Sequence, residues 1–200
     1  MKILIIVPAY NEEKNLPRLF EKLKNNSRQW DVLVINDSSS DSTSSVCYSY
    51  GIKVIDLAVN LGIGGAVQTG YKYALYHGYD RAVQVDADGQ HNPDYIEDML
   101  KKLDEGWDLC IGSRFIKKEG FQSSPLRRAG IKYFSQLIDL LTGQKITDPT
   151  SGFRACNKKV ISLFAHDYPR DYPEPESVVN LKKNGLTVCE IPVSMNKREE

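Results

Sequence analysis

Residues 86–91 read Asp86-Ala87-Asp88-Gly89-Gln90-His91 and directly follow the apolar run Ala82-Val83-Gln84-Val85. Asp86 and Asp88 are separated by one residue at the end of a predicted strand. Their carboxylates therefore point to the same side, roughly 6–7 Å apart along the backbone. With the amide oxygen of Gln90 as a third ligand, they suit one hard divalent cation, Mg²⁺ or Mn²⁺. Such a cation neutralises a diphosphate.

The same stretch has a simpler interpretation, a solvated acidic turn that leads into a helix. Asn92 and Pro93 are typical of a helix N-cap and a first helical residue. Two aspartates alone do not decide between a metal site and a turn, so the decision depends on the rest of the chain.

Strand-like and helical stretches alternate through the first half of the chain. The strands are short continuous apolar runs, which favours a sheet covered by helices on both faces. The alternation predicts an α/β fold with a Rossmann-like, mostly parallel sheet. The expected strands are Ile3–Val7, Val32–Asn36, Lys53–Leu57, Ala82–Val85 and Leu109–Gly112, and the expected helices are Leu16–Asn25, Ser42–Tyr50, Gly65–His77 and Pro93–Glu105.

The second half of the chain has a different pattern. Apolar residues recur at helical spacing over Leu126–Leu141, which predicts an amphipathic helix with a basic start. Such a helix either faces the core or lies at a membrane surface. Beyond it we expect a loop at Asp148–Arg154, a helix at Lys158–Phe164, a Pro-rich turn at Tyr168–Pro175, a helix at Glu176–Asn184 and a strand at Thr187–Val193.

Length and composition limit the classes of function. Two hundred residues suit a single domain, and 26 basic against 26 acidic residues argue against a nucleic-acid partner. No segment approaches the ~20 apolar residues that span a bilayer. The four cysteines lack metal-ligand spacing, which favours a reduced, cytoplasmic compartment. The end at Lys197–Glu200 has no turn or stop signal, so we expect a missing C-terminal tail.

Polar motifs stand at the carboxyl ends of three predicted strands. They are Pro8-Ala9-Tyr10-Asn11, Asp37-Ser38 and Asp86–His91. Ligands of open α/β sheets bind at the carboxyl ends of the strands. The sequence therefore predicts one ligand site at this edge of the sheet.

Five motifs in total occur in a fixed order. They are Val7-Pro8-Ala9-Tyr10-Asn11-Glu12-Glu13, Asn36-Asp37-Ser38-Ser39-Ser40-Asp41, Asp86–His91, Gly112-Ser113-Arg114 and Asp148-Pro149-Thr150-Ser151-Gly152-Phe153-Arg154. In this order they resemble glycosyltransferase family 2, and most of all its branch that acts on dolichol phosphate or polyprenyl phosphate. The resemblance covers essentially the whole chain. It implies a single GT-A domain over residues 1–200, a nucleotide-diphosphate sugar donor, Mg²⁺ or Mn²⁺, and inversion at the anomeric carbon.

The resemblance assigns the donor and the metal to about residues 1–92. Asp37 corresponds to a carboxylate that accepts a hydrogen bond from the base. The chain has Asn36 where relatives have a paired aspartate, so the choice between UDP and GDP stays open. The implied nucleotide-binding residues are Pro8, Ala9, Tyr10, Glu12, Asp37 and Asp86, and the implied metal ligands are Asp86, Asp88 and Gln90.

The resemblance assigns the acceptor to about residues 93–200. Arginine suits this task because its guanidinium binds phosphate bidentately. A phosphate monoester is mostly ionised at pH 7, so we expect Asp148 to orient Arg154 or the acceptor without taking a proton. Glu174 and Glu176 are further carboxylate candidates. The implied acceptor-binding residues are Arg114, Arg127, Arg128, Ser151 and Arg154, and the implied catalytic residues are Asp88, Arg114, Arg128 and Asp148.

We therefore expect metal-dependent, inverting transfer of a hexose from a UDP- or GDP-sugar to a polyprenyl phosphate at the cytosolic face of a membrane. A surface-lying helix or a separate membrane protein would bring the chain to its lipid. Transfer to a sugar hydroxyl of a cell-surface polysaccharide is one alternative. A nucleotidyltransferase lacks support, because no Gly-rich basic loop follows the first strand. Asn36 favours a third alternative, a nucleotide-sugar-binding scaffold without turnover.

Overall fold

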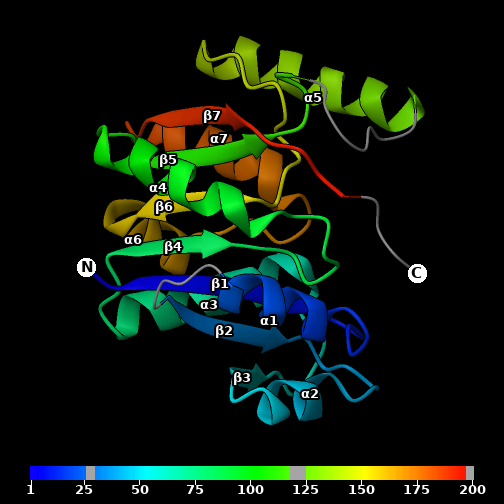
Figure 1. Ribbon diagram of the computed structural model, residues 1–200. Coiled ribbons are helices and arrows are strands. Elements are labelled where there is room, and N and C mark those ends of the chain that lie inside the picture. Colours follow the sequence, from blue (N-terminus) through cyan, green and yellow to red (C-terminus); the bar gives the residue numbers. More distant parts are fainter. Residues whose placement is uncertain (26–29, 118–124, 197–200) are drawn as a thin grey trace.

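The computed structural model describes residues 1–25, 30–117 and 125–196 (Figure 1). Its centre is one seven-stranded sheet with the order β3-β2-β1-β4-β6-β5-β7. Strand β6 runs antiparallel to its neighbours β4 and β5, and the other described pairs are parallel. The strands are β1 (Ile3–Ala9), β2 (Asp31–Asn36), β3 (Lys53–Asp56), β4 (Arg81–Gln84), β5 (Leu109–Ser113), β6 (Arg154–Asn157) and β7 (Val188–Pro192).

Helices connect the strands and cover both faces of the sheet. Asn92 caps the turn before α4, because its side chain accepts a hydrogen bond from the backbone N–H of Asp94 at 3.2 Å. The helices are α1 (Leu16–Asn25), α2 (Thr43–Ser49), α3 (Gly62–Tyr76), α4 (Ile96–Asp104), α5 (Pro125–Thr142), α6 (Lys158–His166) and α7 (Pro173–Lys183), with a 3₁₀ turn at Pro93–Tyr95.

The residues of β1 show how the two layers of core arise. Leu4 and Ile6 pack toward α3 and α6, whereas Ile5 and Val7 pack toward α1 and α4. Successive side chains of a strand point to opposite faces of the sheet. All four side chains are fully buried, because helices cover both faces. Burying such a side chain is worth about 1.5–3 kcal/mol, so a strand apolar at every position stabilises a sheet between two helical layers.

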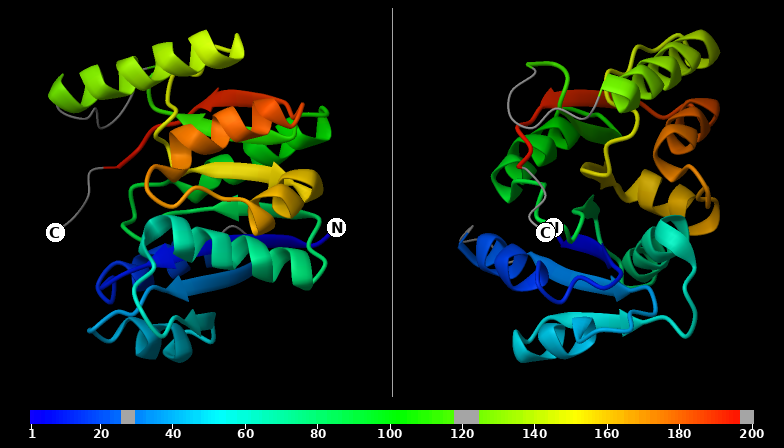
Figure 2. Two further views of the ribbon diagram at one scale, coloured as in Figure 1. Left: turned by 180° about the vertical axis from the view of Figure 1, so that it is seen from behind. Right: turned by 90° about the vertical axis from the view of Figure 1, so that its right-hand side faces the viewer.

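Helix α5 lies at one edge of the fold and packs mainly against α7 (Figure 2). Its apolar stripe is divided. Ile131 and Ile138 are buried, whereas Tyr133 and Leu140 are exposed. Among the helices of the described ranges, none has the length and apolar character needed to cross a bilayer.

The predicted α/β fold with a mostly parallel sheet is confirmed, but two predictions in the second half are wrong. Strand β6 was not predicted, and Arg154 was expected to end a loop. The strand is only four residues long and contains Arg154 and Asn157, so its pattern is weak. Helix α7 begins at Pro173, inside the expected Pro-rich turn, because proline at a first helical position is pre-organised for a helix.

The parallel strands bring three loops together at one edge of the sheet. Asn11 follows β1 with φ 55° and Ser38 follows β2 with φ 62°, both in the left-handed region. The Asn11 side chain accepts a hydrogen bond from the Ser40 N–H at 2.9 Å, and the Asn11 N–H donates to Ser39 Oγ at 2.8 Å. These bonds hold the two loops in conformations that are otherwise uncommon for residues other than glycine.

Candidate active site

A pocket of about 220 Å³ lies at the carboxyl ends of β1, β2 and β4, and we call it the carboxylate pocket. Seven residues predicted to bind the nucleotide or the metal lie in its wall. Gln90 is not among the lining residues. The complete lining is Pro8, Ala9, Tyr10, Glu12, Asp37, Ile63, Ala66, Asp86, Ala87 and Asp88.

Asp37 is fixed between β1 and the start of α3. Its backbone N–H donates to the carbonyl of Ala9 at 2.8 Å, and its Oδ1 accepts the backbone N–H of Leu61 at 2.7 Å. The side chain of Asn60 donates to the Asp37 carbonyl at 3.1 Å. Asp37 therefore presents its carboxyl group to the pocket from a rigid position.

Asn36 has a structural role, which explains why this chain has an asparagine where the family resemblance predicts an aspartate beside Asp37. Its amide nitrogen donates to Asp56 Oδ1 at 2.8 Å and to Ser44 Oγ at 2.7 Å. Hydrogen bonds from Ser44 and Asn36 lower the pKa of the Asp56 carboxyl. A carboxylate at position 36 would face the Asp56 carboxylate, so the amide fits its surroundings. Asn36 therefore gives no support to a scaffold that has lost its activity.

Asp86 and Asp88 follow β4 and form the acidic wall of the pocket. Burial raises the pKa of the Asp86 carboxyl, against the lowering effects of a hydrogen bond from Gln84 and of the charges of Arg114 and Arg154. Asp88 Oδ1 accepts the backbone N–H of Gln90 at 3.0 Å. The Gln90 side chain donates weakly to the carbonyl of Asn196 at 3.4 Å.

The residues present fit a hard divalent cation. Burial of part of the Asp86 side chain raises the pKa of its carboxyl, and the charge of a cation would compensate its carboxylate. In the described ranges there is no group of three or more His, Cys, Asp or Glu residues that could hold a metal. Asp86 and Asp88 therefore supply two carboxylates. Mg²⁺ and Mn²⁺ sites of this kind are completed by water and substrate phosphates.

His91 and Gly152 contact Asp86 from behind the pocket, and sequence reasoning did not identify either. His91 Nδ1 accepts the backbone N–H of Asp86 at 3.0 Å. Burial lowers the pKa of His91 to about 4. A Cβ atom at Gly152 would lie 2.8 and 2.9 Å from the two carboxylate oxygens of Asp86. A histidine so close to two aspartates was a usable signal, whereas nothing in the sequence indicated the Gly152 contact.

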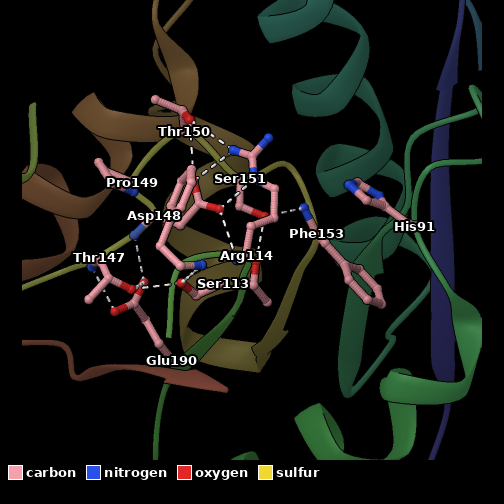
Figure 3. Close-up of polar contacts among 12 residues, drawn as sticks. His91, Ser113, Arg114, Thr147, Asp148, Pro149, Thr150, Ser151, Phe153 and Glu190 are labelled. Atoms are coloured by element: carbon pink, nitrogen blue, oxygen red, sulfur yellow. Dashed lines mark hydrogen bonds and ion pairs between the residues drawn. The ribbon is translucent and has the colours of Figure 1, made fainter. Parts of the chain in front are cut away.

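A second cluster, which we call the acceptor cluster, consists of Arg114, Thr147, Asp148, Thr150 and Glu190 (Figure 3). Arg114 donates to Asp148 through Nε at 2.6 Å and through Nη2 at 2.7 Å. Asp148 is fully buried and Arg114 is 8% exposed. Asp148 therefore orients Arg114, whereas the sequence suggested Arg154 or the acceptor as its partner.

Glu190 supports this cluster from β7. Its carboxylate accepts the backbone N–H groups of Thr147 at 2.7 Å and Asp148 at 2.9 Å. Burial raises the pKa of the Glu190 carboxyl, against these hydrogen bonds. Sequence reasoning missed Glu190, although a carboxylate inside an apolar strand is itself a signal of a buried polar contact.

Arg154 and Ser151 lie in the interior and bind the protein itself. Arg154 is 1% exposed and donates to the carbonyls of Ser151, Pro149 and Glu174 and to Ser177 Oγ, at 2.6–2.9 Å.

Ser151 Oγ donates to the carbonyl of Gly112 at 2.7 Å. In this arrangement both residues fix the 148–154 segment against β5 and α7. Their contact with an acceptor stays a prediction.

The remaining acceptor-side residues lie outside this cluster. Arg128 is exposed near the start of α5, and the side chain of Arg127 is outside the described part of the structure. Glu174 is half-buried, and burial raises the pKa of its carboxyl against the charge of Arg154. Glu176 is exposed.

Comparisons with known proteins agree on the family. The sequence profile of Glycosyl transferase family 2 matches residues 4–164. The chain is 31% identical to the polyprenol monophosphomannose synthase of Mycolicibacterium smegmatis, over 99% of this chain and 78% of that protein. It is also 31% identical to the UDP-N-acetylglucosamine–dolichyl-phosphate N-acetylglucosaminyltransferase of Methanococcus voltae, over 96% of this chain and 84% of that protein.

A solved structure shows the same architecture. The glucosyl-3-phosphoglycerate synthase of Mycobacterium tuberculosis, in complex with Mn²⁺, UDP-glucose and phosphoglyceric acid, matches with a TM-score of 0.76. The match covers 100% of this chain and 72% of that chain at 17% identity, and at this identity it concerns the fold alone. The chain therefore belongs to glycosyltransferase family 2 and is a glycosyltransferase with a GT-A fold.

Proposed function

We propose that this enzyme transfers a hexose, with inversion, from a UDP- or GDP-sugar to a polyprenyl phosphate. One observation carries the proposal. The ends of β1 and β2 converge with Asp86 and Asp88 on one pocket, next to a cluster that presents a buried arginine. Two relatives whose names specify a polyprenol or dolichyl phosphate product or acceptor match nearly the whole chain, which supports the choice of acceptor.

The donor would occupy the carboxylate pocket. Asp37 would accept a hydrogen bond from an N–H of the base, because its carboxyl group is already held in place by Leu61. Tyr10 is half-exposed and offers its ring to the face of the base, and Glu12 lines the same wall. These residues would fix the nucleoside, so that the diphosphate extends toward Asp86 and Asp88.

Asp86 and Asp88 would hold Mg²⁺ or Mn²⁺ in this pocket. When bound, the cation supplies a Lewis acid for the departing diphosphate. The two carboxylates would hold this cation, while the charges of Arg114 and Arg154 lie close enough to lower the pKa of Asp86. The side chains thus provide a preorganised electrostatic environment for the charge that develops on the leaving group.

The acceptor would approach from the side of Arg114. A phosphate oxygen attacks the anomeric carbon, the bond from this carbon to the diphosphate oxygen breaks, and the nucleoside diphosphate leaves with the electron pair. A single in-line displacement inverts the configuration. An ionised phosphate requires no general base, and Asp148 is fully buried and paired with Arg114. This pairing disfavours the alternative in which Asp148 activates a sugar hydroxyl.

The enzyme would work at a membrane, because its proposed acceptor is a lipid. We propose peripheral association at the cytosolic face. Helix α5 exposes Tyr133, Leu140 and Leu141, which are suited to contact with a bilayer surface or with a separate membrane protein.

A transfer assay tests the proposal. The purified chain is incubated with Mn²⁺, undecaprenyl phosphate in detergent micelles, and radiolabelled UDP-glucose, UDP-N-acetylglucosamine or GDP-mannose. We expect radiolabel in the organic phase either with the UDP-sugars or with the GDP-sugar, but not with both. We expect no radiolabel there after addition of EDTA. The lipid-linked sugar should have the anomeric configuration opposite to that of the donor. Transfer to a glycan but not to the lipid phosphate would contradict the proposal.

A further inference from the structure

His91 lies behind the carboxylate pocket, and its two ring nitrogens have different tasks. The backbone N–H of Asp86 points at Nδ1 from 3.0 Å. A backbone amide only donates, so Nδ1 is the unprotonated nitrogen and the ring proton lies on Nε2. Nε2 lies 3.6 Å from Asp86 Oδ2. One imidazole thus fixes the backbone of Asp86 and faces its carboxylate.

The His91 ring itself is held firmly. It is 3% exposed and stacks on the ring of Phe153, with 4.9 Å between the ring centroids and an angle of 15° between the planes. Figure 3 shows His91 and Phe153 beside the acceptor cluster. Phe153 is fully buried in the 148–154 segment, so the position of the imidazole depends on that segment.

The same segment also contacts Asp86 directly, through Gly152. Gly152 leaves so little room that an added Cβ would lie within 2.9 Å of both carboxylate oxygens. The Asp86 carboxylate therefore lies between His91 and Gly152, and the residue that follows Gly152 is Phe153, on which the His91 ring stacks. Asp148, at the start of the segment, holds Arg114. Donor-side and acceptor-side groups are thus joined through one short stretch of chain.

We propose that His91 is a positioning residue, which sets the orientation of Asp86 toward the metal and the donor diphosphate and links it to the 148–154 segment. This inference rests on the proposed function, since it assumes that Asp86 binds a cation. Groups that orient a metal ligand from behind typically change metal affinity by 10–100-fold when they are removed.

Three variants separate positioning from simple support of the fold. His91→Leu removes both ring nitrogens at similar volume, whereas His91→Asn keeps an oxygen that accepts the Asp86 N–H. His77→Leu is the matched control, because His77 is exposed at the end of α3 and stacks on Tyr73. Mn²⁺ affinity is measured by electron paramagnetic resonance, for Mn²⁺ alone and with UDP or GDP. Thermal unfolding without metal is recorded in parallel.

We expect His91→Leu to weaken Mn²⁺ binding about tenfold or more. We expect His91→Asn to stay within about threefold of the wild type, and His77→Leu to match it. In the wild-type protein without metal, ¹⁵N shifts should show a neutral His91 that carries its proton on Nε2. Equal Mn²⁺ affinity in wild type and His91→Leu would overturn the inference, even if the melting temperature falls.

If His91→Leu does not fold, His91→Asn and the ¹⁵N shifts decide. A proton on Nδ1, or a tenfold loss of Mn²⁺ affinity in a folded His91→Asn protein, contradicts the role assigned to Nδ1. Wild-type protein that binds neither Mn²⁺ nor nucleotide and transfers no sugar would overturn the proposed function, and the inference with it. Normal wild-type binding and transfer, together with unchanged Mn²⁺ affinity in a folded His91→Leu protein, would overturn only the inference.

Discussion

The carboxylates on the two sides of the active site have opposite electrostatic surroundings. In the carboxylate pocket, Asp86 and Asp88 make no ion pair with a Lys or Arg of the described ranges. In the acceptor cluster, Asp148 is fully buried and bound bidentately by Arg114. Burial raises the pKa of the Asp86 carboxyl, although the nearby charges of Arg114 and Arg154 act in the opposite direction. The pocket therefore carries negative charge that a cation would compensate, whereas the carboxylate of the cluster already has its arginine partner.

The two groups of carboxylates therefore differ in what they can bind. We propose that Asp86 and Asp88 offer their negative charge to a cation and that this cation would in turn hold a diphosphate. The acceptor side is rigid, because Glu190 and Arg154 bind the backbone of the segment that carries Asp148.

The largest effect is expected from Asp88→Asn. Loss of this carboxylate weakens the hold on the cation and the diphosphate, so kcat/KM should fall by about 10²–10³ or more. The measurement is the transfer assay with saturating Mn²⁺. Asp98→Asn, on the exposed face of α4, is the control and should transfer at the wild-type rate. Activity of Asp88→Asn within tenfold of the wild type would contradict the role that we propose for the Asp88 carboxylate.

The second prediction compares stability on the two sides. Asp148→Ala leaves Arg114 buried without its partner and should cost about 3–5 kcal/mol in urea unfolding. Asp86→Asn removes a desolvated charge and should leave the stability of the metal-free protein unchanged or increased. Equal destabilisation by both substitutions would remove the contrast between pocket and cluster.

The third prediction concerns Gly152→Ala. The new methyl group would crowd the Asp86 carboxylate, so we expect a loss of about 1–3 kcal/mol and weaker Mn²⁺ binding. Gly130→Ala is the control, because an added Cβ there meets no atom within 4 Å. In the middle of α5 it should stabilise the protein slightly. Wild-type Mn²⁺ affinity in Gly152→Ala would show that Asp86 does not depend on this contact.

The smallest effect is a pH dependence at Asp108, which precedes β5 and so lies at the other end of this strand from Arg114. Asp108 is buried, which by itself raises its pKa. Hydrogen bonds from Thr187 and Asn157 prevail and hold the pKa below its usual range. Its contribution to stability is present above the unfolded pKa of about 4 and is lost as the pH falls through the lower folded value. The advantage of wild type over Asp108→Asn in thermal unfolding should therefore shrink below about pH 4. A constant advantage would contradict this assignment.

The sequence predicted the donor side far better than the acceptor side. Pro8, Asp37 and Asp86 were expected to converge, and they do, because parallel strands place their carboxyl ends at one edge. The contact of Gly152 with Asp86 depends on β6, a short antiparallel strand that lies beside β4. Such packing between distant segments leaves no periodic pattern in the chain.

The sequence also did not predict the different surroundings of Arg114 and Arg154. The sequence motif gave Arg154 and Arg114 the same expected task, to bind the acceptor. In the structure, Arg154 is enclosed by carbonyl groups, whereas Arg114 is held by a carboxylate. Whether an arginine faces a ligand or the protein is decided by the surrounding backbone, which the motif does not describe.

Nucleotide binding in the presence and absence of Mn²⁺ shows whether the carboxylate pocket holds a nucleotide together with a cation. Thermal unfolding is recorded with UDP, GDP, CDP or ADP, each with Mn²⁺ or with EDTA, for the wild type and for Asp88→Asn. At about 100 times its Kd, a ligand adds about 2.7 kcal/mol, a shift of roughly 5–11 °C for a chain of this size. We expect this shift in melting temperature for the wild type with UDP or GDP and Mn²⁺. We expect no shift with EDTA or in Asp88→Asn. No shift of the wild type with any nucleotide in the presence of Mn²⁺ would contradict the proposed nucleotide site.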